Sequence, residues 1–153
     1  MQYVVGLRKI ERSPVLFVHK EAPVAGIGPA LGEAYGAIWP YVQRVGVEPA
    51  GPPYARYLSV KPEHAVFEAG VPVSRAVPGE GEISAGELPG GDVAVTTHIG
   101  PFDQMQPAYE AIGAWMREHG RADGGPPWEV YMTDPAEEPD PAKWRTDIVW
   151  PLA

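Results

Sequence analysis

Hydrophobic residues recur at three- and four-residue steps in two stretches of the chain, which is the pattern of a helix with one buried face. The first stretch covers residues 29–45, and Pro40 inside it predicts a kink or a break because proline lacks the backbone donor of a helix interior. The second stretch follows residues 100–103 and runs to His119. Gly46 and Gly120 come directly behind the two stretches and are expected to cap the helices. The apolar faces consist of Leu31, Tyr35, Ile38, Trp39, Val42 and Val45, and of Met105, Ala108, Tyr109, Ile112, Trp115 and Met116.

Short apolar and β-branched runs, bounded by Gly, Pro or Asp and by charged residues, predict strands around these helices. One of them, within residues 125–135, is opened by Gly-Pro-Pro and closed by Asp-Pro. A short strand is also expected near residues 83–88, inside a connection rich in Gly, Pro and Glu. The other predicted strands cover residues 2–10, 14–20, 54–60, 65–73, 92–99 and 143–152.

Several features return at a spacing of 74 residues, which indicates an internal repeat. The spacing relates Gly46 to Gly120, Tyr57 to Tyr131, and the Ala-Tyr pair at 34–35 to the pair at 108–109. Each half reads as strand, helix, strand, strand. We therefore expect one α+β domain over residues 1–153, built from two pseudo-symmetric β-α-β-β repeats at about 1–76 and about 81–153. The repeats are expected to form an antiparallel sheet with two helices on one face and a groove between them, and such a seam is a common place for a ligand site.

The strand within 125–135 carries a single acid, Glu129, among aromatic and apolar residues. Alternation along a strand puts Glu129, Tyr131 and Thr133 on one face. If that face is covered, the carboxylate must hold a proton, find an internal partner or await a cationic ligand. The alternative is a solvated glutamate on an edge strand. The matching position in the first half is Ala55, so the proposed repeat keeps the tyrosine and breaks at the acid.

Composition narrows the possible partners. The formal net charge is -8 and the 12 Lys and Arg residues are scattered, which argues against direct nucleic-acid binding and favours cationic or neutral partners. The chain has no cysteine, so thiol chemistry and thiolate metal sites are excluded. The four histidines lack metal-ligand spacing, and we expect no metal and no cofactor. Without a long apolar run or a signal-like start, we expect no membrane association and a cytoplasmic location.

Three segments together resemble the GyrI-like family, the gyrase-inhibitor-like, AraC-type effector-binding domain. They are Thr-His-Ile-Gly-Pro-Phe at 97–102, Trp-Glu-Val-Tyr at 128–131 with Thr-Asp-Pro at 133–135, and Thr-Asp-Ile-Val-Trp-Pro-Leu at 146–152. The resemblance covers nearly the whole chain and is strongest at the Gly-Pro-aromatic turn and the Glu-x-Tyr strand. It implies a small-molecule groove between two repeats, with Glu129 in the pocket.

The resemblance leaves the activity open between binding and catalysis. We expect a standalone, multidrug-type binding protein for aromatic, often cationic, compounds, and not an enzyme. The alternatives are a hydrolase that opens cyclopropane rings in aromatic alkylating compounds, with Glu129 as general base and Tyr131 assisting, or an adaptor that contacts gyrase or another protein partner. For an aromatic cation, Glu129 would supply charge and aromatic rings would supply faces. The expected ligand-binding residues are Glu129, Tyr131, Tyr57, Trp39, Phe102, Trp144 and Trp115.

Other aromatic residues have simpler expected roles. Tyr109, Ile112 and Met116 follow the spacing of the sheet-facing side of the second helix and are expected to belong to the core. Trp128 and Trp150 are expected to point away from the ligand or to lie at the rim of the site.

Overall fold

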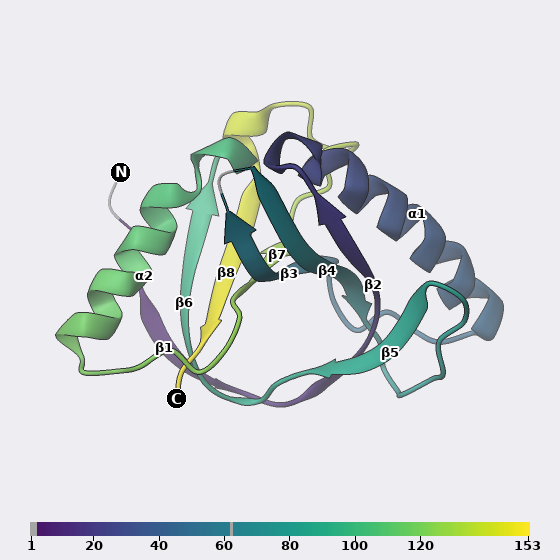
Figure 1. The fold of residues 1–153 in the computed structure, drawn as a ribbon, viewed down its shortest axis with the longest axis horizontal. Coiled ribbons are helices and arrows are strands. Elements are labelled where there is room, and N and C mark those ends of the chain that lie inside the picture. The colour runs from purple at the N-terminus through teal and green to yellow at the C-terminus, as the bar shows by residue number, and fades with distance from the viewer. Residues whose placement is uncertain (1–2, 62) are drawn as a thin grey trace. The chain divides into compact units, whose positions relative to one another are not determined.

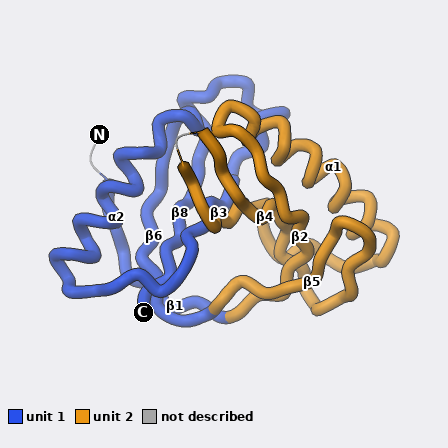
Figure 2. The backbone as a smooth tube through the Cα atoms, viewed as in Figure 1, with its two compact units in different colours: residues 1–11, 90–153 blue, residues 12–89 orange. Residues whose placement is uncertain are grey.

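The structure, a computed structural model, describes residues 3–61 and 63–153 and has an α+β fold of antiparallel strands with two α-helices (Figure 1). The chain divides into two compact units (Figure 2). Unit 1 comprises residues 1–11 and 90–153, and unit 2 comprises residues 12–89. The predicted fold class is confirmed. The internal repeat, its boundaries and the groove stay predictions.

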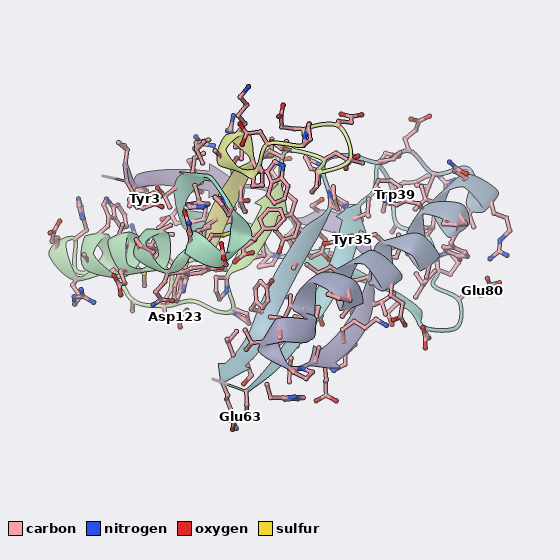
Figure 3. The ribbon with its side chains drawn as sticks, turned by 90° about the horizontal axis from the view of Figure 1, so that it is seen from above. Tyr3, Tyr35, Trp39, Glu63, Glu80 and Asp123 are labelled. Carbon is pink, nitrogen blue, oxygen red and sulfur yellow. The ribbon has the colours of Figure 1, made fainter. Side chains whose placement is uncertain are left out.

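Unit 2 holds four antiparallel strands in the order β3-β4-β2-β5 and one long helix that contacts β2 and β4. The helix buries Ala34, Ile38 and Val42 against strand residues such as Leu16 and Val71. Half-buried Tyr35 and Trp39 lie on the same helix (Figure 3) and pack against this core. The elements are β2 (Ser13–Ala22), η1 (Val24–Gly26), α1 (Ile27–Val45), β3 (Tyr54–Lys61), β4 (His64–Pro72) and β5 (Ile83–Leu88).

Helix α1 runs through Pro40 without interruption, so the break predicted there is wrong. Proline removes one backbone donor, and the burial of Ile38 and Val42 on either side of it offsets that loss. The predicted cap is confirmed: Gly46 adopts φ 70°, a left-handed conformation that glycine reaches without steric cost, and its N–H donates to the Gln43 carbonyl.

Unit 1 has four antiparallel strands in the order β1-β6-β8-β7 and a helix against β6 and β8. Helix α2 buries Ala108, Ile112 and Met116 against Ala94 and Ile148. The elements are β1 (Gly6–Ile10), β6 (Gly91–Ile99), η2 (Phe102–Gln104), α2 (Gln106–Glu118), β7 (Trp128–Tyr131), η3 (Pro141–Lys143) and β8 (Arg145–Pro151).

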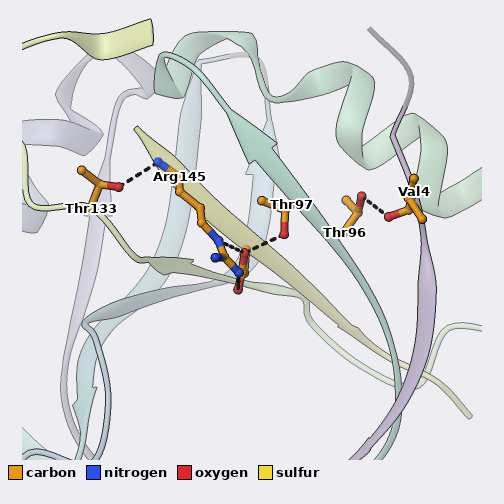
Figure 4. Close-up of polar contacts among 6 residues, drawn as sticks. Val4, Thr96, Thr97, Thr133 and Arg145 are labelled. Atoms are coloured by element: carbon orange, nitrogen blue, oxygen red, sulfur yellow. Dashed lines mark hydrogen bonds and ion pairs between the residues drawn. The ribbon is translucent and has the colours of Figure 1, made fainter. Parts of the chain in front are cut away.

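Two of the predicted strands differ from the observed ones. The strand predicted over 2–10 begins at Gly6, and residue 2 lies outside the described residues. The strand predicted within 125–135 is only four residues long, and Thr133 follows it as a bend. The Thr133 hydroxyl instead accepts a hydrogen bond from the Arg145 backbone N–H (3.0 Å), so it caps the start of β8 (Figure 4).

Candidate functional site

The pairing of β6, β8 and β7 places a row of polar side chains on one face of unit 1. Ile148 lies opposite both Thr96 and Glu129, and Thr146 lies opposite both His98 and Tyr131. Directly opposed residues share a face, and so do residues two positions apart along a strand. Ile148 packs under α2. The whole row therefore lies on the face that α2 covers.

Glu129 is the acid of this row, and only 8% of its surface is exposed. Its carboxylate accepts two hydrogen bonds from phenols: Tyr109 Oη donates to Oε2 at 2.5 Å, and Tyr131 Oη donates to Oε1 at 2.9 Å. Tyr109 comes from α2 and Tyr131 from the same strand as the acid. We call Glu129, Tyr109 and Tyr131 the glutamate site. It holds a buried carboxylate whose two oxygens are each oriented by a hydroxyl.

Burial raises the pKa of Glu129 above its ordinary value, because the charged form loses its hydration. The hydrogen bonds from Tyr109 and Tyr131 lower the pKa, and a positive charge on His98 lowers it as well, but these effects are smaller than that of burial. The ionised carboxylate in this site therefore lacks a full counter-charge. A cation that reached Glu129 would supply one.

Two aromatic rings, Phe102 and Trp144, extend the glutamate site outward from Tyr131. Phe102 stacks on Trp144 with centroids 4.8 Å apart and meets Tyr131 edge-on at 5.4 Å. We call Phe102, Trp144 and Tyr131 the aromatic trio. Phe102 is 39% exposed, so the trio extends from the buried carboxylate to the surface. On the other side, Trp150 meets the Tyr109 ring edge-on at 6.0 Å.

The Gly-Pro-Phe turn that ends β6 is held from two sides. Gly100 adopts φ 137°, which glycine tolerates, and its N–H donates to the Trp144 carbonyl (2.8 Å). The His98 Nε2 donates to the Pro101 carbonyl at 2.9 Å, since a carbonyl can only accept. Trp144 is fixed separately, because its Nε1 donates to the Glu138 carbonyl. These contacts set the position of Phe102 against Trp144.

His98 is 2% exposed, and both of its ring nitrogens have partners. Nε2 bonds Pro101, and Nδ1 lies 2.7 Å from the Tyr3 hydroxyl. With Nε2 donating to Pro101, Nδ1 of the neutral ring accepts from the Tyr3 hydroxyl, so both ring nitrogens hold the imidazole in place.

A family model described as the GyrI-like small molecule binding domain matches residues 5–153. The chain belongs to the GyrI-like family. No curated protein shows significant sequence similarity to it. Among the described residues, no helix is both long and apolar enough to span a membrane.

Solved structures share the fold of this GyrI-like domain at low identity. The C-terminal domain of EcmrR is 21% identical with a TM-score of 0.82, covering 100% of this chain and 99% of that chain. EcmrR in a complex with DNA is 23% identical with a TM-score of 0.83, covering 98% of this chain, which spans only 57% of that chain. A hydrolase from Listeria innocua is 13% identical (TM-score 0.71, 97% and 91% covered). SAV2435 bound to tetraphenylphosphonium is 11% identical (TM-score 0.61, 100% and 94% covered).

The structure places four of the seven expected ligand-binding residues of the GyrI-like domain in one cluster: Glu129, Tyr131, Phe102 and Trp144. Trp115 is also in unit 1. It belongs to α2, packs against the core of that unit, and stacks on the His119 ring with the centroids 4.3 Å apart. The two remaining residues are in unit 2. Trp39 packs on the α1 core, and Tyr57 contacts Phe67 at 5.8 Å.

Two tryptophans were expected to point away from the ligand or to lie at the rim of the site. Trp128, the neighbour of Glu129 on β7, points to the other face of the strand and is buried in the core at 3% exposure. Trp150 lies on the same face as Glu129, where it packs beside Tyr109, and its Nε1 donates to Asp123 (3.0 Å). Trp150 therefore does not point away from Glu129, and its half-buried place beside Tyr109 fits the other alternative, a position at the rim of the site.

Tyr109 was expected to be a core residue, and the prediction missed its contact with Glu129. The helical spacing correctly put it on the sheet-facing side of α2, but its hydroxyl ends at the acid. The 74-residue spacing carried the missing signal, because it preserves both tyrosines, as Tyr35 with Tyr109 and Tyr57 with Tyr131. At the position of Glu129 unit 2 has buried Ala55, and there Tyr35 donates to the Tyr54 carbonyl instead.

The opposite face of the same strands carries a separate polar group (Figure 4). The Asp147 carboxylate accepts from the Thr97 hydroxyl (2.8 Å) and from the Arg145 guanidinium (3.2 Å and 3.3 Å). This acid already has a cationic partner in Arg145, whereas Glu129 forms no ion pair with any residue that the structure describes. Glu129 is therefore the better candidate for a cationic ligand.

Removing the Tyr131 hydroxyl takes one hydrogen bond from the Glu129 carboxylate and leaves the carboxyl group itself in place. We expect Tyr131→Phe to weaken the binding of an aromatic cation about tenfold at neutral pH. Loss of the hydrogen bond raises the Glu129 pKa further, and a protonated carboxyl group offers the cation no opposite charge. Isothermal titration calorimetry at several pH values measures this effect. The matched control is Tyr41→Phe in unit 2, which removes a hydroxyl that donates to the Pro78 carbonyl. An equal loss in both variants would contradict the assigned role of Tyr131.

Proposed function

We propose that this GyrI-like domain binds aromatic, often cationic, small molecules, with Glu129 as the counter-charge and the aromatic trio as the surface for the rings. The observation that carries the proposal is the buried Glu129 carboxylate, which accepts hydrogen bonds from two tyrosine hydroxyls and forms no ion pair with any described residue. Burying such a charge without a cation costs free energy. A ligand cation that pairs with it recovers part of that cost on binding.

The aromatic trio gives this proposal its ligand class. Phe102, Trp144 and Tyr131 offer ring faces and edges next to the carboxylate, and each close cation–π contact in a dry site contributes about 0.5–2 kcal/mol. Apolar burial adds about 25 cal/mol per Å². Neither term depends on a particular arrangement of ligand donors. We therefore expect a broad selectivity governed by charge and aromatic area.

The structure of SAV2435, which shares this fold, contains tetraphenylphosphonium, an aromatic cation. This supports the choice of phosphonium compounds as first probes. Methyltriphenylphosphonium and triphenylphosphine oxide are a matched pair, since both carry three phenyl rings on phosphorus and differ in charge.

The proposal predicts that the cation of this pair binds more tightly than the neutral oxide, by at least about tenfold, which corresponds to about 1.4 kcal/mol. Quenching of tryptophan fluorescence would report binding, because Trp144 and Trp150 lie in and beside the site. Calorimetry would give the stoichiometry. Equal affinities, or a tighter complex with the oxide, would contradict a role for charge in recognition.

A second candidate function is hydrolysis of strained cyclopropane rings in aromatic alkylating compounds. It is favoured by the raised pKa of Glu129 and by the two hydroxyls beside it, since a carboxylate of higher pKa is a stronger general base. Glu129 would take a proton from water as the water oxygen bonds to a ring carbon. The carbon–carbon bond that breaks would pass its electron pair into the conjugated aromatic system of the compound, which then takes up the proton from Glu129. Mass spectrometry after incubation with such a compound would detect the hydrated product. No turnover by the wild type would leave binding as the function.

A further inference from the structure

Thr146 stands out in the polar row under α2. Its side chain is 0% exposed, and its Oγ1 has no hydrogen-bond partner among the described residues. A buried hydroxyl without a partner costs folding free energy, because in water it would be hydrogen-bonded. Such an atom calls for an explanation.

The side chains around Thr146 do not use its hydroxyl. It lies opposite His98, whose two nitrogens are bonded to Tyr3 and Pro101, and opposite Tyr131, whose hydroxyl donates to Glu129. The next residue on its own face, Ile148, is apolar. A threonine hydroxyl can donate once and accept twice, so Thr146 keeps all of this capacity.

The unused hydroxyl lies beside the glutamate site. Glu129 pairs with Ile148 in the ladder, so Thr146 is its diagonal neighbour on the same face, at a backbone separation of about 7–8 Å. One ligand nitrogen can lie between the two side chains at this separation. A protonated amine there would pair its charge with Glu129 and donate an N–H to Thr146 Oγ1.

We propose that Thr146 is a specificity-determining residue that makes the site prefer aromatic amines with a protonated N–H over quaternary cations, an inference that rests on the proposed function. Quaternary nitrogen and phosphonium carry the same charge but no hydrogen to donate. They satisfy Glu129 and leave Thr146 unpaired. The Thr146 hydroxyl therefore distinguishes protonated amines from quaternary cations of the same charge.

A ligand reaches Thr146 only after a covering side chain moves, because the hydroxyl is fully enclosed. Phe102 is the exposed aromatic side chain of the cluster, and it contacts Tyr131, the residue opposite Thr146. In this proposal the ligand enters beside Phe102 by displacing its ring.

The test uses two naphthylmethyl cations, one with a dimethylammonium group and one with a trimethylammonium group. Both carry one positive charge near neutral pH, and only the first has an N–H. For the wild type we expect the dimethylammonium compound to bind about tenfold more tightly, as for one charge-assisted hydrogen bond. In Thr146→Val, which keeps the shape and removes the hydroxyl, the two affinities should become equal through loss of the N–H compound alone.

Stability gives a second readout with a matched control on the same face. Thr146→Val should leave the thermal midpoint unchanged or raise it, since no hydrogen bond is lost. Thr96→Val should lower the midpoint, because the Thr96 hydroxyl donates to the Val4 carbonyl at 2.8 Å (Figure 4), and should keep the tenfold preference. If Thr146→Val does not fold, Thr146→Ser should keep the preference and Thr146→Ala should lose it.

The outcomes separate the two proposals. If both cations bind the wild type equally, or if the preference survives loss of the hydroxyl, Thr146 does not determine specificity while the function around Glu129 stands. An equal loss for both cations in Thr146→Val would mean that Thr146 only shapes the site, and would overturn the inference. If neither cation binds the wild type, the proposed function fails and the inference fails with it.

Discussion

Glu129→Gln is expected to weaken the binding of methyltriphenylphosphonium about 100-fold, which corresponds to about 2.7 kcal/mol, and to leave the binding of triphenylphosphine oxide nearly unchanged. The substitution preserves size and removes the charge. Truncating one partner of a buried charge pair typically costs about 2–5 kcal/mol of binding free energy. The neutral oxide makes the ring contacts without the charge pair, so only the cation should be affected.

Glu110→Gln is the matched control for this change. Glu110 lies on α2 next to Tyr109 in sequence and is exposed, so the variant alters the net charge equally without touching the glutamate site. The formal net charge of -8 attracts cations at long range, and this control removes that contribution from the comparison. Equal losses in the two variants, or an unchanged affinity in Glu129→Gln, would show that Glu129 is not the counter-charge.

Glu129→Gln should also raise the free energy of unfolding of the unliganded protein at neutral pH. Burial raises the pKa of Glu129 on folding, so the charged form of this carboxyl group is penalised in the folded protein. Glutamine carries no charge to desolvate. Its carbonyl can accept from one tyrosine hydroxyl and its amide can donate to the other, so both contacts of Glu129 can be replaced.

The stability of the wild type relative to Glu129→Gln should change with pH in a defined direction. Because the pKa of Glu129 is raised in the folded state, the folded protein holds a proton that the unfolded chain has already released. Stability therefore falls as pH rises from the ordinary pKa of a glutamate through the raised value, and stays low above it. Urea unfolding of wild type and Glu129→Gln across this range should show the wild type losing stability relative to the variant. A wild type that gains relative stability with rising pH would contradict the burial of an unpaired charge.

Glu129→Gln is thus expected to weaken cation binding and to stabilise the unliganded protein. Both effects have one cause, because the charge of Glu129 favours a cationic ligand and destabilises the protein without one. A bound cation should return that stability to the wild type in proportion to its concentration over its Kd, and should do so much less in Glu129→Gln. The change in thermal midpoint when methyltriphenylphosphonium is added to each protein measures this effect.

The periodic patterns predicted the elements well, because each helix and strand buries one face. Residues 54–60 and 83–88, for example, were predicted as strands and correspond to β3 and β5. The break at Pro40 was wrong because intrinsic helix propensity is weaker than the packing of α1 on its core. Patterns along the sequence do not show how strongly a helix packs against its core.

The site was predictable in part. Alternation puts Glu129 and Tyr131 on one strand face, and in the structure the Tyr131 hydroxyl donates to the Glu129 carboxylate. The neighbours of His98 and Thr146 depend on the pairing of β6 with β8 and of β8 with β7, which joins residues up to 58 positions apart, as for Val93 with Pro151. The hydrogen bond between Tyr3 and His98 joins residues 95 positions apart. Register of this kind is a property of the folded sheet, and no local pattern encodes it.

The most direct test of the central claim is a crystal structure of the protein with methyltriphenylphosphonium. The account predicts the charged phosphorus centre beside the Glu129 carboxylate, with phenyl rings against Phe102, Trp144 or Tyr131, and no such density in crystals of Glu129→Gln grown and soaked in the same way. Density for the cation away from Glu129 in the wild type, or at the same place in both proteins, would contradict it.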